Sequence, residues 1–317
     1  MSWKTLKAWI DVQKIPRHSN DVFSFVLGSV LAWYNAGAFH PGIFLCALAA
    51  VFFIANGIYL TNEAQDYEGD RLNAGRIGGR GGMGLVTTGG TQVLVRGYLK
   101  REHVQAVGML FFALAIPLGL VIQFVFRAPP WTIPLGVVGM FITYSYSNPP
   151  IKASYRGLGE TCMMVGYALL ILTAYYMQAG LSWFPLIIAL PRILTVPALK
   201  IIREFPDRIA DEATGKRTLV VIFGQRRMAS VYVALIVLSL IAFIPTVVVT
   251  RSPFALLNVL PAIYLVRSII PMVRGHWHKR AALELACSAG FIGLLLTPIT
   301  IALTFLLDGL IRVFDTW

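Results

Sequence analysis

Charged residues and cysteines are both scarce in this chain of 317 residues. Only 13% of its residues are charged, whereas 57% are hydrophobic and the mean hydropathy is +0.70. This balance excludes a soluble globular protein and indicates a polytopic membrane protein. The three cysteines, Cys46, Cys162 and Cys287, lie far apart in apolar runs. Their spacing excludes both a disulfide framework and a zinc site of closely spaced thiolates.

Long apolar runs fill most of the chain. A span of the bilayer needs roughly 17–25 apolar residues. Windows of about this length fall at 21–39, 42–61, 104–125, 131–147, 158–179, 182–200, 229–249, 254–273 and 283–307. We therefore expect an all-α fold, a bundle of nine transmembrane helices around a central cavity, in one domain over residues 1–317. We expect no cleavable signal peptide, because the first run is as long as a span and lacks a small-residue cleavage site.

Basic residues outnumber acidic ones by 27 to 15, which gives a net charge of +12. They concentrate in alternate loops, at 1–20, 71–102, 152–156, 200–227 and 274–280. The positive-inside rule then predicts a cytoplasmic N-terminus and an external C-terminus, in a prokaryotic inner membrane. In a soluble protein this charge would favour nucleic acid as the partner, whereas here we expect membrane lipid and no nucleic acid.

The few acidic residues form two clusters, the first of which ends the second apolar run. Asn62, Asp66 and Asp70 are four residues apart each time. On a helix this spacing places all three side chains on one face. An acidic face where an apolar segment meets water is costly unless cations satisfy it.

The second cluster follows the sixth apolar run at the same inner level. Glu204, Asp207 and Asp211 are separated by three and four residues, which again predicts one helical face. Pro206 removes a backbone donor there and predicts a kink or break. Since the two clusters are four spans apart, a ring of helices can bring them face to face across the cavity.

Two opposed carboxylate faces can hold Mg²⁺, which binds through a few carboxylates together with substrate phosphates. Lys152 and Arg156 lie at the same inner level and suit a polyanion. The long apolar helices suit a hydrophobic tail. A prenyl diphosphate has all of these features, and the aromatic faces of Tyr144 or Tyr146 can stabilise the allylic cation it leaves. Positive-inside topology alone also accounts for the two basic residues.

Glycine is dense between residues 71 and 102. The pattern Gly79-x-Gly81-x-x-Gly84 is no dinucleotide fingerprint, because no strand precedes it. The glycine-rich loop 75–90 has two interpretations, an anion-binding concavity that touches substrate or an interfacial loop. His276 and His278 belong to a short basic loop, and we interpret them as interfacial and not as a metal site.

These clusters resemble a known family. The segments 62–70 and 207–219, Asn62-x-x-x-Asp66-x-x-x-Asp70 and Asp207-x-x-x-Asp211 with Gly-Lys-Arg-Thr-Leu, resemble the two aspartate-rich motifs of the UbiA superfamily of intramembrane prenyltransferases. Segments 88–91, 155–160 and 204–207 most resemble the menaquinone branch, whose members transfer polyprenyl groups to 1,4-dihydroxy-2-naphthoate. The resemblance covers most of the chain.

The resemblance implies Mg²⁺-dependent transfer from a polyprenyl diphosphate to a small, aromatic acceptor. It implies that the metal and the diphosphate are bound by Asn62, Asp66, Asp70, Asp207 and Asp211. It also implies that Lys152 and Tyr146 contact the diphosphate and that Glu204 supports the metal or orients the acceptor. Arg156 and Lys200 are further candidate substrate contacts.

Three departures from the family pattern leave the acceptor open. Glu63 replaces a frequent Asp, Arg203 replaces a frequent Asn, and Pro16-Arg17 reverses an Arg-Pro pair. Alternatives are a prenyltransferase for another acceptor, a membrane terpene cyclase with no acceptor, and a secondary transporter that uses the acids as ion sites. Transporter sites usually lie near mid-bilayer, whereas these acids lie at the inner ends of spans.

Overall fold

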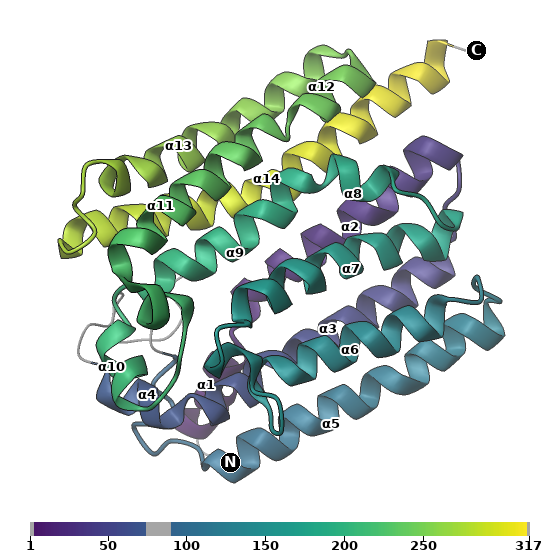
Figure 1. The fold of residues 1–317 in the computed structure, drawn as a ribbon. Coiled ribbons are helices and arrows are strands. Elements are labelled where there is room, and N and C mark those ends of the chain that lie inside the picture. The colour runs from purple at the N-terminus through teal and green to yellow at the C-terminus, as the bar shows by residue number, and fades with distance from the viewer. Residues whose placement is uncertain (1–2, 74–89, 316–317) are drawn as a thin grey trace.

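The computed structural model describes residues 3–73 and 90–315, and this part of the chain is helical (Figure 1). Besides turns it contains a π-helix, η1 (Val121–Val125), and two 3₁₀ helices, η2 (Ala153–Tyr155) and η3 (Pro253–Asn258). The α-helices are α1 (Trp3–Gln13), α2 (Ile15–Ala36), α3 (Pro41–Gln65), α4 (Tyr67–Leu72), α5 (Arg101–Leu120), α6 (Thr132–Ser147), α7 (Gly159–Ala179), α8 (Phe184–Ile188), α9 (Leu190–Glu204), α10 (Arg208–Ala213), α11 (Leu219–Ile241), α12 (Ile244–Thr250), α13 (Val259–Val273) and α14 (Arg280–Asp315).

The predicted all-helical membrane fold is confirmed, and every predicted apolar window coincides with a helix. Six stretches are long and apolar enough to cross a bilayer, namely Pro41–Gln65, Arg101–Val125, Gly159–Ala179, Leu219–Thr250, Pro253–Val273 and Arg280–Val313. The other three windows coincide with α2, with α6, and with α8 together with most of α9. Helix α2 begins with a polar stretch, and α6 and α9 have 16 and 15 residues. The count of nine spans therefore stays a prediction. Most of the glycine-rich loop 75–90 lies outside the described residues.

Proline and glycine fix the ends of the first two long helices. Pro16 lies in the first turn of α2, where its missing N–H costs nothing. Gly37 ends the same helix in the left-handed region at φ 63°, and its N–H donates to the carbonyl oxygen of Trp33. Pro41 then begins α3. A left-handed Lys14, at φ 54°, separates α1 from α2 and lets the chain turn into the bundle.

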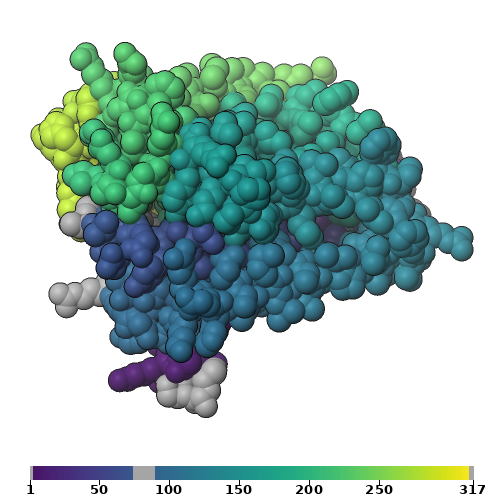
Figure 2. Space-filling view, turned by 60° about the horizontal axis from the view of Figure 1, so that its bottom comes forward, coloured from purple at the N-terminus to yellow at the C-terminus, as the bar shows by residue number. Residues whose placement is uncertain are grey.

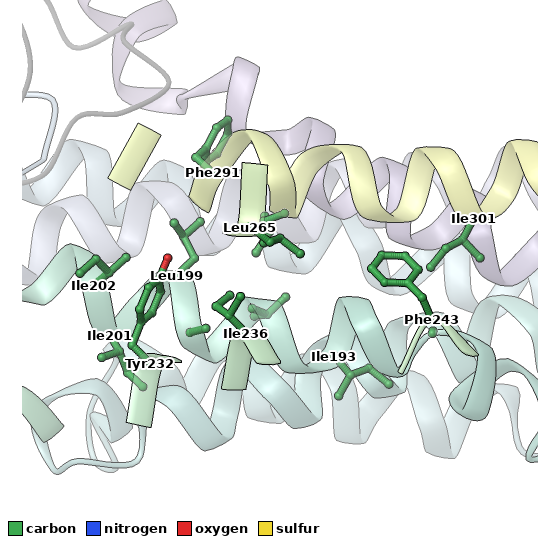
Figure 3. Packing of buried hydrophobic residues seen from close by; sticks show 14 of the residues in the cluster. Ile193, Leu199, Ile201, Ile202, Tyr232, Ile236, Phe243, Leu265, Phe291 and Ile301 are labelled. Atoms are coloured by element: carbon green, nitrogen blue, oxygen red, sulfur yellow. The ribbon is translucent and has the colours of Figure 1, made fainter. Parts of the chain in front are cut away.

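The long helices form layers that run in similar directions (Figure 1). Helix α9 packs against α7 on one side and against α11 and α14 on the other. Figure 3 shows this core, where Leu199, Ile236, Leu265 and Phe291 meet from α9, α11, α13 and α14. Helices α2 and α7 approach so closely that a Cβ on Gly28 would lie 2.4 Å from the carbonyl oxygen of Ile171.

The short helices α1, α4 and α10 gather at one end of the bundle (Figure 1). Helix α4 continues the chain beyond α3, α10 continues it beyond α9, and the two pack against each other. In Figure 2 the dark blue surface of α4 adjoins the green surface of α10. The fold thus joins the ends of two helices that are far apart in the sequence.

Candidate active site

A cavity of about 960 Å³ lies among the helices and has two chemically different ends. Its apolar walls come mainly from α3, α5, α6 and α7, with side chains such as Ile58, Phe112, Met140 and Leu170. Its polar end is lined by members of both acidic clusters, Asn62, Asp66, Asp70, Glu204, Asp207 and Asp211. The predicted central cavity exists, and both clusters reach it.

The first cluster keeps its helical spacing across the end of α3. The N–H of Asp66 donates to the carbonyl oxygen of Asn62 at 2.8 Å, and that of Asp70 donates to the carbonyl oxygen of Asp66 at 2.9 Å. The Asn62 amide donates to Asp66 Oδ2 and to the Ser147 hydroxyl, both at 2.9 Å. The Tyr155 hydroxyl donates to Asp66 Oδ1 at 2.7 Å. Hydrogen bonds therefore orient the Asp66 carboxylate from two sides.

The second cluster is divided by the helix break expected at Pro206. Helix α9 ends at Glu204, and α10 begins at Arg208 with Asp207 as its N-cap residue. The break predicted at Pro206 is therefore present, and it places Glu204 on a different helix from the two aspartates, so the three do not share one helical face as their spacing alone predicted. Asp207 and Asp211 remain one turn apart, since the N–H of Asp211 donates to the carbonyl oxygen of Asp207 at 2.9 Å.

Lys216 joins the two clusters. Its ammonium nitrogen lies 3.2 Å from Asp66 Oδ1 and 3.7 Å from Asp211 Oδ1. It also lies 5.2 Å from the centre of the Tyr155 ring. A second link comes from Asn73, three residues after the first cluster, whose side-chain amide donates to Asp207 Oδ1 at 2.6 Å. Lys216 follows Gly215 of the second motif in the sequence, but this position gives no sign that its side chain pairs with an aspartate of each cluster.

Burial and neighbouring charges shift the pKa values of the aspartates at this end in different directions. Burial works to raise the pKa of Asp66, but Lys216 and the Tyr155 hydroxyl lower it below its usual value. Burial and the carboxylates of Glu63 and Asp66 raise the pKa of Asp70 well above its usual value. Burial raises the pKa of Asp211 to about 6 in spite of Lys216. Asp70 and Asp211 therefore hold a proton more readily than Asp66 does.

In the described part of the chain, no three His, Cys, Asp or Glu side chains already converge as a metal site. The ammonium of Lys216 pairs with both Asp66 and Asp211, one carboxylate from each cluster.

Glu63 takes part in a different network from the aspartates. It is only 2% exposed, and its Oε2 lies 2.6 Å from the ammonium of the buried Lys14. Its Oε1 accepts hydrogen bonds from the backbone N–H of Thr91, at 2.7 Å, and from the Thr91 hydroxyl. Glu63 thus fastens the start of α2 and the chain that follows the glycine-rich loop to α3. This departure from the family pattern has a structural explanation.

Gly90 brings that chain against the first cluster. It lies in the left-handed region at φ 63°, and a Cβ there would lie 1.9 Å from Asp70 Oδ2. The side chain of Gln92 donates to the carbonyl oxygen of Asp70 at 3.1 Å. Only glycine fits this close approach with this backbone conformation. The end of the loop therefore touches the candidate site, whereas residues 74–89 are outside the described part.

Glu204 belongs to a buried trio with Lys200 and Glu160. The Lys200 ammonium contacts a Glu204 carboxylate oxygen and lies 3.5 Å from Glu160 Oε1. It lies 5.9 Å from the centre of the Tyr146 ring. Lys200, Glu204 and Tyr146 line the cavity as expected. Their predicted substrate contacts stay predictions.

Lys152 and Arg156 do not line the cavity, unlike the other predicted site residues. Lys152 lies in a left-handed turn at φ 47°, and its ammonium lies over the Tyr155 ring at 5.1 Å. Arg156 is exposed, and its guanidinium donates to the carbonyl oxygen of Pro150 at 3.2 Å. The basic residues that do line the cavity include Lys14, Arg17, Arg203 and Lys216, which we had not predicted as site residues.

Comparisons with known proteins agree with this architecture. Residues 22–270 match the UbiA prenyltransferase family. The chain is 29% identical over 226 residues, 70% of its length and 68% of the relative's, to a 2-carboxy-1,4-naphthoquinone phytyltransferase from Synechocystis sp. (strain ATCC 27184 / PCC 6803 / Kazusa). It is 24% identical over 204 residues, 63% of its length and 61% of the relative's, to a 1,4-dihydroxy-2-naphthoate octaprenyltransferase from Bacillus subtilis (strain 168).

A solved structure has the same fold. The UbiA homolog from Archaeoglobus fulgidus, bound to DMAPP and Mg²⁺, aligns with a TM-score of 0.58 at 15% identity, over 92% of this chain and 99% of its own. The family match covers most of the sequence and includes both acidic clusters. This chain therefore belongs to the UbiA prenyltransferase family and is a membrane-embedded prenyltransferase.

Proposed function

We propose that the chain transfers a polyprenyl group from a polyprenyl diphosphate to 1,4-dihydroxy-2-naphthoate, with Mg²⁺ as cofactor. One observation carries this proposal: aspartates from two distant helix ends line the polar end of a single cavity whose other walls are apolar. A diphosphate needs the first kind of surface, and a polyprenyl chain needs the second.

The residues present fit Mg²⁺. Asp66, Asp70, Asp207 and Asp211 offer carboxylate oxygens, and Asn62 offers an amide oxygen, which are the hard donors that this ion prefers. We propose that these five residues hold the ion. When bound there, Mg²⁺ would neutralise the charge that develops on the departing diphosphate.

The remaining polar residues position the diphosphate and its carbon chain. Lys216 lies beside Asp66 and Asp211, and Arg17 and Arg203 line the same end. Such cations stabilise the leaving group as the bond between C1 and the diphosphate oxygen breaks. The rings of Tyr146 and Tyr155 line the cavity at this end and can stabilise the allylic cation. The acceptor ring then forms its new carbon–carbon bond to C1, and the attacked ring carbon gives up a proton, or its carboxylate as carbon dioxide, which restores the aromatic ring while diphosphate leaves.

The acceptor class rests on the relatives. Two curated relatives, from Synechocystis and Bacillus subtilis, are prenyltransferases whose names contain a naphthoquinone or a naphthoate. Naphthoates are flat, partly apolar molecules, which suits a cavity with both polar and apolar walls.

The test is a transfer assay with purified protein, Mg²⁺, a labelled polyprenyl diphosphate and 1,4-dihydroxy-2-naphthoate, followed by mass spectrometry of the product. We expect prenylated naphthol from the wild type, and a loss of about a hundredfold or more in rate for Asp66→Asn and Asp207→Asn. Chelation of Mg²⁺ should stop the reaction in every sample.

The matched control is Asp308→Asn. Asp308 accepts a hydrogen bond from Tyr34 at 2.7 Å and pairs with Arg312 at 2.9 Å, away from the cavity. Its variant should keep the wild-type rate. A wild-type protein that ionises the diphosphate but gives only an acceptor-free terpene would contradict the proposal, as would equal losses in all three variants.

A further inference from the structure

A second polar cluster lines the same cavity and contains no residue of the aspartate motifs. It consists of Asp21 from α2, Tyr59 from α3, Tyr167 from α7 and Arg192 from α9. The Tyr167 hydroxyl donates to Asp21 Oδ1 at 2.8 Å. The Tyr59 hydroxyl lies 3.4 Å from Asp21 Oδ2 and 3.3 Å from the carbonyl oxygen of Arg17, and its one hydrogen can be donated to either. Tyrosines from α3 and α7 thus approach one carboxylate on α2, with Arg192 of α9 beside Tyr167. We call these four residues the Asp21 cluster.

The Asp21 cluster lies deeper in the bundle than the metal-binding end. Tyr59 precedes Asn62 by three residues on α3, which places it about 4.5 Å further along the helix axis at 1.5 Å per residue. It precedes Asp66 by seven residues, about 10 Å by the same measure. The cluster therefore lies between the site of the diphosphate and the apolar walls.

Arg192 anchors this cluster in the bundle. Its side chain is fully buried, and its three nitrogens donate to the Ser24 hydroxyl and to the carbonyl oxygens of Asn20 and Leu294, at 3.0 to 3.1 Å. Its guanidinium lies 4.6 Å from the centre of the Tyr167 ring. The positive charge is thus held in place next to the tyrosine that donates to Asp21. Ionisable groups at this depth are costly, and they usually mark a functional site.

The other three members present surface to the cavity. Asp21, Tyr59 and Tyr167 are only partly buried, whereas Arg192 is wholly enclosed. The longer of the two tyrosine bonds, at 3.4 Å, is weak and can give way to a better donor. A carboxylate accepts up to about four hydrogen bonds, so Asp21 has capacity for a ligand hydroxyl.

We propose that the Asp21 cluster is the subsite for the acceptor, a flat aromatic molecule with a ring hydroxyl that donates to the Asp21 carboxylate. This inference rests on the proposed prenyl transfer. A hydrogen bond to a carboxylate increases electron density on the hydroxyl oxygen and on the ring, which makes the ring carbon a better nucleophile. Tyr59 and Tyr167 flank the hydroxyl, and Arg192 keeps Tyr167 in place. Asp21 is then a specificity-determining residue that selects for hydroxyl donors.

The experiment compares Asp21→Asn and Tyr167→Phe with the wild type. Hydrogen bonds to a charged group are worth roughly tenfold to a hundredfold in affinity, so the KM for 1,4-dihydroxy-2-naphthoate should rise by about that factor in Asp21→Asn. Tyr167→Phe should raise it by a smaller factor. The affinity for a non-reactive polyprenyl diphosphate analogue, measured with Mg²⁺ and no acceptor, should stay at the wild-type value in both.

Tyr232→Phe is the matched control, because Tyr232 is a buried tyrosine that donates to Ser268 at 2.7 Å and does not line the cavity. It should leave the acceptor KM unchanged. An unchanged acceptor KM in Asp21→Asn overturns the inference, and so does a parallel loss of affinity for the diphosphate analogue. If Asp21→Asn fails to fold, Tyr59→Phe and Tyr167→Phe decide by the same measurements.

Equilibrium titration with 1,4-dihydroxy-2-naphthoate separates this inference from the proposed function. If the wild type transfers no prenyl group but binds the naphthoate, and Asp21→Asn weakens that binding, the subsite stands and the proposed reaction fails. If the wild type transfers the group while both proteins bind the naphthoate equally, the reaction stands and the subsite fails.

Discussion

Replacing Lys216 with methionine should make the protein depend on Mg²⁺ for its stability. In the structure Lys216 lies between Asp66 and Asp211, and its side chain is only 17% exposed. Removing one partner of a buried ion pair costs about 3–5 kcal/mol. Because these side chains keep some exposure, we expect the lower end, about 3 kcal/mol, in metal-free protein. A divalent ion that binds both carboxylates restores the missing positive charge.

The assay is thermal unfolding of the purified protein in detergent, followed by tryptophan fluorescence at increasing Mg²⁺ concentration. Without Mg²⁺, Lys216→Met should unfold at a lower temperature than the wild type. Added Mg²⁺ should raise its Tm by more than it raises the wild-type Tm, because the ion no longer competes with an ammonium group. Its transfer rate should still fall by roughly a hundredfold, since a cation beside the leaving diphosphate is lost.

Two controls decide whether the reasoning holds. Lys216→Arg keeps the charge and should remain close to the wild type without Mg²⁺. Arg208→Met removes an exposed partner of Glu212, at 3.8 Å, and should change neither the Tm nor its response to Mg²⁺. Equal Mg²⁺-induced increases in the wild type and in Lys216→Met would show that the lysine and the metal do not share a site.

Two further predictions concern the acidic end of the cavity. Gly90→Ala should weaken Mg²⁺-dependent transfer at least tenfold, because the new Cβ collides with the Asp70 carboxylate. The control is Gly97→Ala, which has a similar φ of 69° and no atom within 4 Å of the new Cβ, and should keep its transfer rate. Equal transfer rates in the two variants would contradict this prediction. Between about pH 5 and pH 7.5 the apparent Mg²⁺ affinity should rise as Asp211, with a pKa of about 6, loses its proton. The metal-free protein should lose stability as the pH rises from about 4 to about 6, because between the ordinary pKa of 3.8 and the raised value of about 6 the folded state binds the proton more tightly than the unfolded state. Asp211→Asn should remove this part of both profiles.

The sequence was informative about helices and about the spacing of the acidic residues. Apolar windows located every long helix, because burial in lipid requires long apolar runs whatever the packing. The four-residue spacing of Asn62, Asp66 and Asp70 survives the end of α3, since the backbone hydrogen bonds continue across it. Pro206 predicted the division of the second cluster. These features are local, and local chemistry determines them.

Contacts between distant segments could not be predicted in this way. Lys216 contacts Asp66 across 150 positions of the sequence, so only the packing of α4 against α10 reveals the pair. Lys152 and Lys216 lie at similar distances from the Tyr155 ring, 5.1 and 5.2 Å, but only Lys216 of the two lines the cavity. The sequence alone does not distinguish basic residues of neighbouring loops from one another, because the folded path of each loop determines which side chain lines the cavity.

The role proposed for Asp21 could not be predicted from the sequence either. It is an isolated acid in the polar first turns of α2, and neither spacing nor motif distinguishes it from a solvated residue. Its partners come from α3 and α7, which the fold places around it. If the aspartates hold the diphosphate and Asp21 holds the acceptor hydroxyl, the two polar layers lie about 10 Å apart along α3. The prenyl C1 then lies between its leaving group and its nucleophile, which is the order that substitution at that carbon requires.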